Sequence, residues 1–133
     1  MIFLDSNIPM YLIGAPHPKQ TEAQILTDRL IAAGERLVTD TEVLQEILHR
    51  YTSINRRQFI RPGFVAVRGL VDEIFPVEEP DLWRAAEIVE KPSQFSARDA
   101  IHIAIMQRHS IQRILSFDAD FDQWPGIERI HQV

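Results

Sequence analysis

The chain has 133 residues, the size of one domain with a single core, so we expect one domain over residues 1–133. Hydrophobic residues make up 45% and charged residues 25% of it, the balance of a soluble globular protein. The sequence contains no apolar run of about 18 residues and no secretory signal, so we expect a cytoplasmic protein without a membrane span. Because cysteine is absent, disulfides, thiolate zinc sites and cysteine nucleophiles are excluded.

The formal net charge is -5, whereas proteins that bind nucleic acid non-specifically are usually basic. This balance argues weakly against a simple nucleic-acid-binding protein. It leaves room for an enzyme whose carboxylates hold metal ions that meet the phosphates. The 14 basic residues are arginines apart from Lys19 and Lys91, and arginine is the better residue for two-point contacts with phosphate.

Short apolar segments alternate along the chain with segments of helical periodicity. Strands are predicted at 2–5, 36–39, 74–77, 113–118 and 127–130, the third at a sheet edge because it contains Pro76. After a break at 15–18, where two prolines occur, the helical pattern resumes, and Gly34 is well placed to end that helix. In all, helices are predicted over about 8–14, 19–33, 40–51, 64–71, 80–90 and 96–109. This alternation predicts an α/β fold, a three-layer α/β/α sandwich with a central parallel β-sheet.

Two of the predicted strands end on a carboxylate. Asp5 follows the apolar run of "MIFLDSN", and Asp118 closes "RILSFD". Ligands of open parallel sheets lie at the carboxyl ends of the strands, near the point where strand order reverses. If the first and fourth strands are neighbours, these two carboxylates converge. Taken alone, Asp5 is as easily explained as a turn or helix cap.

Two further acidic residues occur on predicted helices. Glu46 lies close to an apolar helix face, where the structural alternative is an ion pair with Arg50. Asp99 completes a capping box that begins at Ser96. The helix behind it is largely apolar, which carries Asp99 to the edge of the core, where a helix N-terminus favours an anion. His102, three residues later, is expected to be a buried, hydrogen-bonded core residue rather than a catalytic base.

Three aspartates alternate in "SFDADFDQW". A calcium-binding EF-hand loop beginning at Asp118 is excluded, because Gln123 replaces the required glycine and Arg129 the required glutamate. Some of these aspartates are then turn formers. The best candidate for a metal ligand is Asp118, because it directly follows the strand, and Asp120 and Asp122 are weaker candidates.

A gathering of unpaired carboxylates requires protons or a cation to offset its repulsion. Oxygen ligands without cysteine or clustered histidine suit Mg²⁺ or Mn²⁺ better than zinc. Such an ion in an open site supplies what phosphodiester hydrolysis needs, a water of lowered pKa and neutralised phosphate charge. An aspartate-nucleophile phosphatase also begins with a strand ending in Asp, but it places a second Asp where this chain has Asn7.

Four segments resemble, in order and spacing, the four acidic motifs of the PIN-domain family. They are "IFLDSN", "TEVLQEILHRY", "SARDAIHIAIM" and "ILSFDADFDQW", and the resemblance covers essentially the whole chain. The chain is most similar to the VapC-type toxins of bacterial toxin–antitoxin pairs. The resemblance implies a PIN-like parallel sheet, a ribonuclease that depends on Mg²⁺ or Mn²⁺, a homodimer, and inhibition by a small cognate antitoxin.

The resemblance also implies roles for particular residues. The catalytic quartet would be Asp5, Glu46, Asp99 and Asp118. The metal ligands would be Asp5, Asp99 and Asp118, with Glu46, Asp120 and Asp122 as further candidates. Small polar residues beside the acids would support them from a second layer, namely Asn7 and Ser116. Two rival interpretations stay open, a PIN-domain RNA-processing nuclease that is not a toxin, and a catalytically silent PIN-like binding module.

The segment "HRYTSINRRQFIR" (49–61) is the most basic part of the chain. One interpretation is a rim that guides RNA to the acidic centre, with aromatic side chains available to stack on bases. Another is a solvated helix connection, and a third is a docking site for an acidic antitoxin tail. The arginines concerned are Arg50, Arg56, Arg57 and Arg61.

Overall fold

The computed structural model describes residues 1–92 and 95–132 of the chain. Within them, parallel strands form one sheet in the order β3-β2-β1-β4-β5. The strands are β1 (Ile2–Leu4), β2 (Leu37–Asp40), β3 (Glu73–Phe75), β4 (Arg113–Leu115) and β5 (Glu128–Ile130). The predicted central parallel sheet is therefore confirmed, and β3 lies at its edge, with Pro76 just beyond its last residue.

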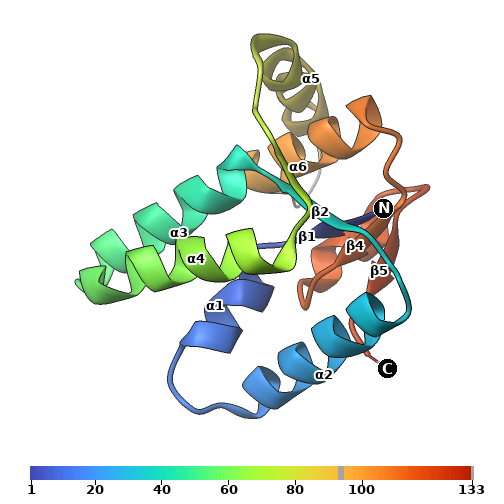
Figure 1. Ribbon diagram of the computed structural model, residues 1–133. Coiled ribbons are helices and arrows are strands. Elements are labelled where there is room, and N and C mark those ends of the chain that lie inside the picture. Colours follow the sequence, from blue (N-terminus) through green and yellow to red (C-terminus); the bar gives the residue numbers. More distant parts are fainter. Residues whose placement is uncertain (93–94, 133) are drawn as a thin grey trace.

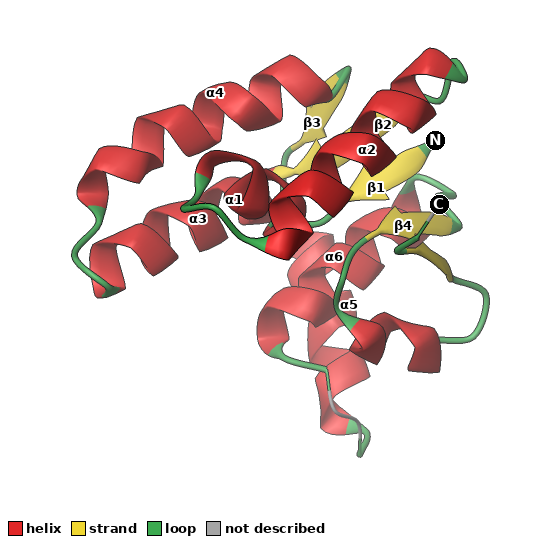
Figure 2. Cartoon of the chain, turned by 90° about the horizontal axis from the view of Figure 1, so that it is seen from below, coloured by secondary structure: helices red, strands yellow, loops and turns green. Residues whose placement is uncertain are grey.

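The helices cover both faces of this sheet (Figures 1 and 2). Those on one side lie between β1 and β3 in the chain, and α5 and α6 connect β3 to β4 on the other side. Right-handed crossovers produce this division, because the chain moves outward to β3 and then returns to the far side of β1. The helices are α1 (Asn7–Ile13), α2 (Pro18–Ala32), α3 (Thr41–Ser53), α4 (Ile60–Leu70), α5 (Glu79–Glu90) and α6 (Ala97–Arg108). Short 3-10 helices are η1 (Arg57–Phe59) and η2 (Ala119–Gln123).

The strand order reverses between β1 and β4. Phe3 is in register with Ile114, and the amide of Asp5 donates to the carbonyl of Leu115 over 3.1 Å, just past the last paired residues. The first and fourth strands are thus neighbours, as the site prediction requires. The carboxyl ends of β1, β2 and β4 meet at one edge of the sheet, where ligands of open parallel sheets bind.

The core surrounds β1, whose three residues are completely buried because helices cover both faces of the sheet. On α6, Ile103, Ile105 and Met106 are also completely buried, which makes this helix the most enclosed of those facing the sheet. A helix that is apolar on most sides was expected here, and its burial fixes the positions of the polar residues in its first turns.

Several predicted boundaries were wrong. Helix α2 begins at Pro18 and α4 begins two residues before Pro62, although both prolines were expected to precede their helices. Proline is tolerated in a first helical turn, whose amides have no partner within the helix. Strand β4 ends at Leu115 instead of 118, because the next residues turn into η2 and Asp118 caps it. Gly34 follows the C-cap of α2 with φ 78°, as predicted.

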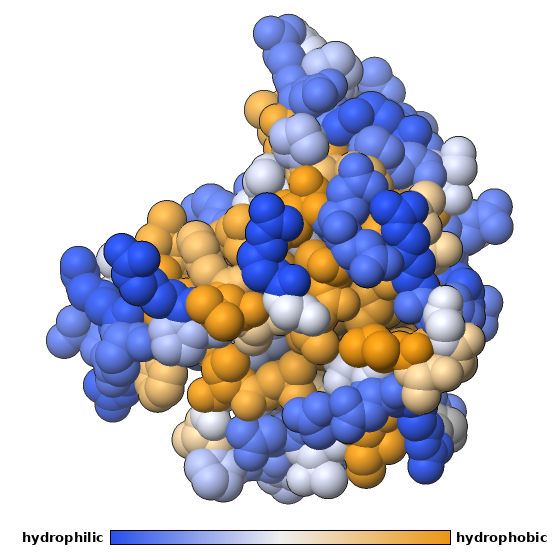
Figure 3. Space-filling model, in the orientation of Figure 1, coloured by the Kyte–Doolittle hydropathy of each residue, from blue (hydrophilic) through white to orange (hydrophobic). Residues whose placement is uncertain are grey.

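Helices α3 and α4 form a hairpin that extends away from the sheet (Figure 1). Apolar residues gather in the middle of the face shown in Figure 3, over the region of α1, α2 and α4, and polar residues surround them. Of the helices in the described ranges, none is long and apolar enough to cross a membrane.

Candidate active site and metal centre

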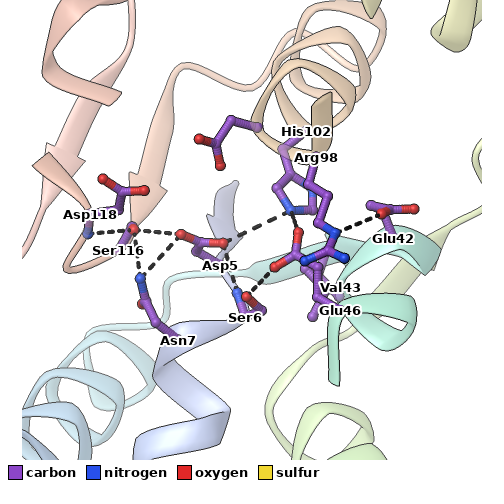
Figure 4. A network of polar contacts seen from close by, with 12 residues as sticks. Asp5, Ser6, Asn7, Glu42, Val43, Glu46, Arg98, His102, Ser116 and Asp118 are labelled. Atoms are coloured by element: carbon purple, nitrogen blue, oxygen red, sulfur yellow. Dashed lines mark hydrogen bonds and ion pairs between the residues drawn. The ribbon is translucent and has the colours of Figure 1, made fainter. Parts of the chain in front are cut away.

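Asp5 lies at the centre of a hydrogen-bond network at the carboxyl end of β1 (Figure 4). Its side chain accepts from the amide of Ser6 over 2.8 Å, from the hydroxyl of Ser116 over 2.6 Å and from the Asn7 amide group over 3.3 Å. Ser116 Oγ in turn accepts from Asn7 Nδ2 and from the backbone amide of Asp118. One serine hydroxyl therefore links the turn after β1 to the turn after β4.

Glu46 reaches this network from α3. Its Oε2 accepts a hydrogen bond from the Ser6 hydroxyl, and its Oε1 lies 2.6 Å from Nε2 of His102. Both carboxylate oxygens are therefore held by groups from other elements. The alternative ion pair with Arg50 is not formed, and the exposed Arg50 has no ion-pair partner among residues 1–92 and 95–132.

His102 is completely buried and lies between three carboxylates. Its Nδ1 is 2.7 Å from Asp40 Oδ2, and its Nε2 is 3.9 Å from Asp5 Oδ1 as well as 2.6 Å from Glu46. Asp40, the last residue of β2, is also completely buried and caps α3 by accepting from the amide of Val43. The expected buried, hydrogen-bonded histidine is thus present, but its partners belong to the acidic site.

A second acidic group lies where α6 begins and η2 follows β4. One carboxylate oxygen from each of Asp99, Asp118 and Asp120 can be chosen so that all lie within 4.8 Å of one another. Ser96 caps α6 by accepting from the amide of Asp99, and Asp118 accepts from the amide of Asp120. Within the described part of the chain, no basic side chain lies within ion-pair distance of these three carboxylates.

Asp122 does not join either acidic group. Its two carboxylate oxygens accept from Arg129 over 2.8 and 2.9 Å, and its side chain is about half exposed. Arg129 is only 8% exposed and also donates to the carbonyl of Ser116. This pair therefore braces the turn that carries Asp118.

The electrostatics of the two groups differ. Burial raises the pKa of Asp5 to about 6, a rise that Glu46 increases and that His102, Ser116 and Ser6 oppose. Burial would also raise the pKa of Glu46, but the hydrogen bond and charge of His102 outweigh it and lower that pKa.

The same contacts act on the histidine. Burial lowers the pKa of His102, but the charges and hydrogen bonds of Asp40 and Glu46 overcome this and raise it well above its usual value. An imidazole that holds its proton this strongly is no general base at neutral pH. The pKa of Asp99 is raised by burial and then by repulsion from Asp118, and the charge of His102 and hydrogen bonds with Ser96 only partly oppose this rise.

The donor chemistry of the second group fits a divalent ion. Three carboxylates without a basic partner repel one another, and hard oxygen ligands suit Mg²⁺ or Mn²⁺. Of the predicted residues, the structure brings Asp5, Asn7, Glu46 and Ser116 into one network and Asp99, Asp118 and Asp120 into an adjacent group.

Sequence reasoning missed Ser6 and Asp40 as parts of the site. The signal for Asp40 was available, because it follows a buried apolar run and precedes a helix, as Asp5 does. Ser6 gave no distinguishing signal, because a polar residue after Asp5 is equally typical of a turn.

Comparison with known proteins agrees with this architecture. Residues 2–126 match the family model described as PIN domain. The chain therefore belongs to the PIN-domain family. It is 53% identical over 130 residues to ribonuclease VapC13 of Mycobacterium tuberculosis (strain H37Rv), covering 98% of this chain and 99% of the relative, which places it with the VapC ribonucleases in that family.

Solved structures have the same fold. The crystal structure of Mycobacterium tuberculosis VapC20, described as a toxin that cleaves the sarcin–ricin loop, superposes with a TM-score of 0.74 at 25% identity, covering 96% of this chain and 97% of that one. A structure of VapBC2 from Rickettsia felis, bound to a DNA fragment of its promoter, also gives a TM-score of 0.74, at 13% identity and full coverage of both chains.

Proposed function

We propose that this chain is a divalent-metal-dependent ribonuclease and the toxin of a toxin–antitoxin pair. The observation that carries the proposal is the convergence of acids from β1, α3, α6 and the turn after β4 at the switch point of the sheet. A silent binding module for RNA gains nothing from such clustered carboxylates. The identity to a protein named as a ribonuclease, over nearly the whole of both chains, favours the enzyme further.

In this proposal Asp99, Asp118 and Asp120 hold an Mg²⁺ or Mn²⁺ ion, and Asp5 completes the ligand set. The ion supplies a water of lowered pKa and neutralises charge on the phosphate. Asn7 and Ser116 hold the Asp5 carboxylate in a fixed orientation through their hydrogen bonds. These second-layer contacts keep a ligand preorganised, as in other metal sites.

The direct test is RNA cleavage by purified protein with Mg²⁺ or Mn²⁺ and with EDTA, on labelled tRNA and on a sarcin–ricin loop hairpin. Asp99→Asn is expected to reduce cleavage roughly 100-fold or more, because it removes a charged ligand of the ion. Asp28→Asn is the matched control, because Asp28 is an exposed carboxylate on α2, outside both acidic groups. Equal activity of wild type and Asp99→Asn would refute the assignment.

An RNA strand is proposed to reach the acids along a groove between α1 and the end of α3. The groove has a volume of about 400 Å³, and its lining includes Asn7, Tyr11, His17, Arg50 and Ile54. Its continuity with the Asp5 network and its aromatic and basic lining suit a single strand. The remaining arginines of the basic segment, Arg56, Arg57 and Arg61, are exposed on the hairpin beyond it.

Arg50→Ala is expected to raise KM for RNA by roughly threefold or more while leaving kcat nearly unchanged, because a lost phosphate contact weakens binding at every step. Arg68 on α4 provides the control, since it is exposed like Arg50. Its replacement by alanine should leave KM within error. An equal rise in KM for both variants would show only a general effect of net charge.

The biological partner is proposed to be a small antitoxin made beside this protein in the cytoplasm. The solved complex of VapBC2 supports a partner of this kind, because its chain has the same fold. Expression of the chain alone should arrest growth, and co-expression of the adjacent small reading frame should restore it. Harmless expression of a protein that cleaves RNA would instead favour an RNA-processing enzyme. The proposed homodimer should appear at twice the mass of the chain in light scattering.

A further inference from the structure

We propose that Arg98 is a catalytic residue whose guanidinium binds the phosphate group that is cleaved, and that Glu42 holds this guanidinium aside when no RNA is bound. The inference rests on the proposed metal-dependent ribonuclease. It adds to that site a positive charge from the protein itself, which the acidic residues cannot supply.

Arg98 lies in the first turn of α6, immediately before Asp99. Figure 4 shows its guanidinium between the carboxylates of Glu42 and Glu46, which α3 carries. Burial raises the pKa of Glu46, while the contacts with His102 and Ser6 and the charge of Arg98 lower it. The guanidinium is therefore within electrostatic reach of the acidic network.

The hydrogen-bond donors of Arg98 are available to a ligand. Among residues 1–92 and 95–132, its one ion-pair contact is with Glu42, and the 4.0 Å from Nε to Oε1 is too long for a hydrogen bond. Three arginines that brace the fold are instead each held by a carboxylate through two hydrogen bonds of 2.8 or 2.9 Å. They are Arg108 with Asp81, Arg113 with Glu35 and Arg129 with Asp122.

An RNA phosphate needs such a group here, because carboxylates repel it. The proposed divalent ion offsets the charge of the group that contains Asp99, but Glu42 and Glu46 lie on the side of α3. Of the two basic side chains near them, His102 is completely buried, whereas Arg98 is 41% exposed. An incoming strand can therefore reach Arg98.

The chemistry of hydrolysis gives this contact its effect on rate. A water oxygen forms a bond to phosphorus while the bond from phosphorus to a ribose oxygen breaks, and one proton of the water ends on that ribose oxygen. The other phosphate oxygens carry the negative charge throughout. A guanidinium presents its N–H groups in a planar fork that matches two such oxygens, so Arg98 stabilises the transition state while Asp99 and its neighbours hold the ion.

The experiment compares Arg98→Ala and Arg98→Lys with wild type and with Arg84→Ala. Arg84 is the matched control, because its side chain is 40% exposed and it bonds to Gln107, near the opposite end of α6. Cleavage of labelled RNA with Mn²⁺ gives kcat and KM. Binding of a 2′-O-methyl RNA in EDTA is followed by fluorescence anisotropy, and folding by circular dichroism.

Arg98→Ala is expected to lower kcat by roughly 100-fold, the usual effect of removing one preorganised donor that faces charge in a transition state. Arg98→Lys should recover part of this loss, because it restores the charge without the two-point contact. Millimolar guanidinium ion should raise the kcat of Arg98→Ala but not that of Arg84→Ala. Affinity of Arg98→Ala for the 2′-O-methyl RNA should fall about threefold, because one phosphate contact is lost.

Glu42→Gln tests the second half of the inference. Glutamine keeps the size of the side chain but loses the charge that attracts Arg98, which frees the guanidinium for the substrate. KM should fall by up to about threefold, in keeping with the small energy of a partly exposed ion pair, and kcat should not fall. If the pair only stabilised the fold, Glu42→Gln and Arg98→Ala would lose activity together.

Two results would overturn the inference. One is a kcat of Arg98→Ala within about threefold of wild type, and the other is an equal fall of kcat in Glu42→Gln. If Arg98→Ala fails to fold, Arg98→Lys replaces it, and a kcat equal to that of wild type is then the contrary result. Absence of cleavage by wild type would refute the proposed function. The anisotropy assay would still decide the phosphate contact, which equal affinity of wild type and Arg98→Ala for the 2′-O-methyl RNA would deny.

Discussion

Replacement of Asp5 by asparagine should make the protein more stable when divalent ions are absent. Asp5 is 5% exposed, and burial raises the pKa of its carboxyl from 3.8 to about 6. At neutral pH the folded chain therefore contains an ionised carboxylate that is buried away from solvent water. The charge favours a metal ligand, and it opposes folding.

The magnitude follows from the two pKa values. A rise from 3.8 to about 6 corresponds to roughly 3 kcal/mol of folding free energy lost when the carboxyl is ionised in both states. Because the folded chain keeps this proton to a higher pH than the unfolded chain, the loss is absent below pH about 4 and complete above pH about 6. Asparagine removes the charge, but it has one side-chain oxygen where Asp5 uses two, for Ser6 and for Ser116. The lost hydrogen bond lowers the stability of the variant by about 1 kcal/mol. The net gain is about 1–2 kcal/mol.

Urea unfolding in EDTA at pH about 7 should show this gain for Asp5→Asn, and at pH about 4 the gain should vanish. Added Mn²⁺ should stabilise the wild type more than the variant, which keeps Asp99, Asp118 and Asp120 but lacks the charge of Asp5, so that the difference in stability shrinks. Asp122→Asn, which removes an exposed carboxylate, should not be stabilised under any of these conditions. If wild type is as stable as Asp5→Asn in EDTA at pH about 7, the reasoning is refuted.

Other measurements address neighbouring features. Mn²⁺ affinity, measured by calorimetry, should fall as the pH drops below about 6, because protons then compete for the carboxylate of Asp5, whose pKa burial raises to that value. Asp40→Ala should cost about 3–5 kcal/mol in urea unfolding, since it leaves the imidazolium of His102 without its buried partner and also removes the cap of α3. Phe121→Leu should cost about 1–2 kcal/mol and weaken Mn²⁺ binding, because this completely buried ring anchors η2, which follows Asp118; an unchanged Mn²⁺ affinity would contradict that link.

Much of the fold could be predicted because its signals are local. Short segments with apolar residues identified the strands, and their alternation with helices implied parallel pairing. The errors occurred at prolines and at the end of β4, where position within a turn decides the outcome. Pro18 and Pro62 are compatible with either side of a helix start, and only the packed structure shows which side each occupies.

The site was predictable only in part, for a related reason. Asp5 and Asp118 could be placed together once β1 and β4 were taken as neighbours. The contact between His102 and Asp40 joins residues 62 positions apart, and neither local segment contains a pattern that predicts it. Which oxygen faces which donor depends on the packing of α6 against the sheet, which periodicity does not encode.

The pairing of β1 with β4 also determines when during synthesis the site can exist. Asp5 is made 108 or more residues before strand β4 and the hydroxyl of Ser116, which lie beside it in the folded chain. Chains are synthesised from the N-terminus, so a nascent chain that ends before Arg113 has neither β4 nor the acids of η2. A translation product interrupted before Arg113 therefore lacks Ser116, Asp118 and Asp120. The full set of acids at this edge of the sheet therefore exists only after the segment from β4 to η2 has left the ribosome.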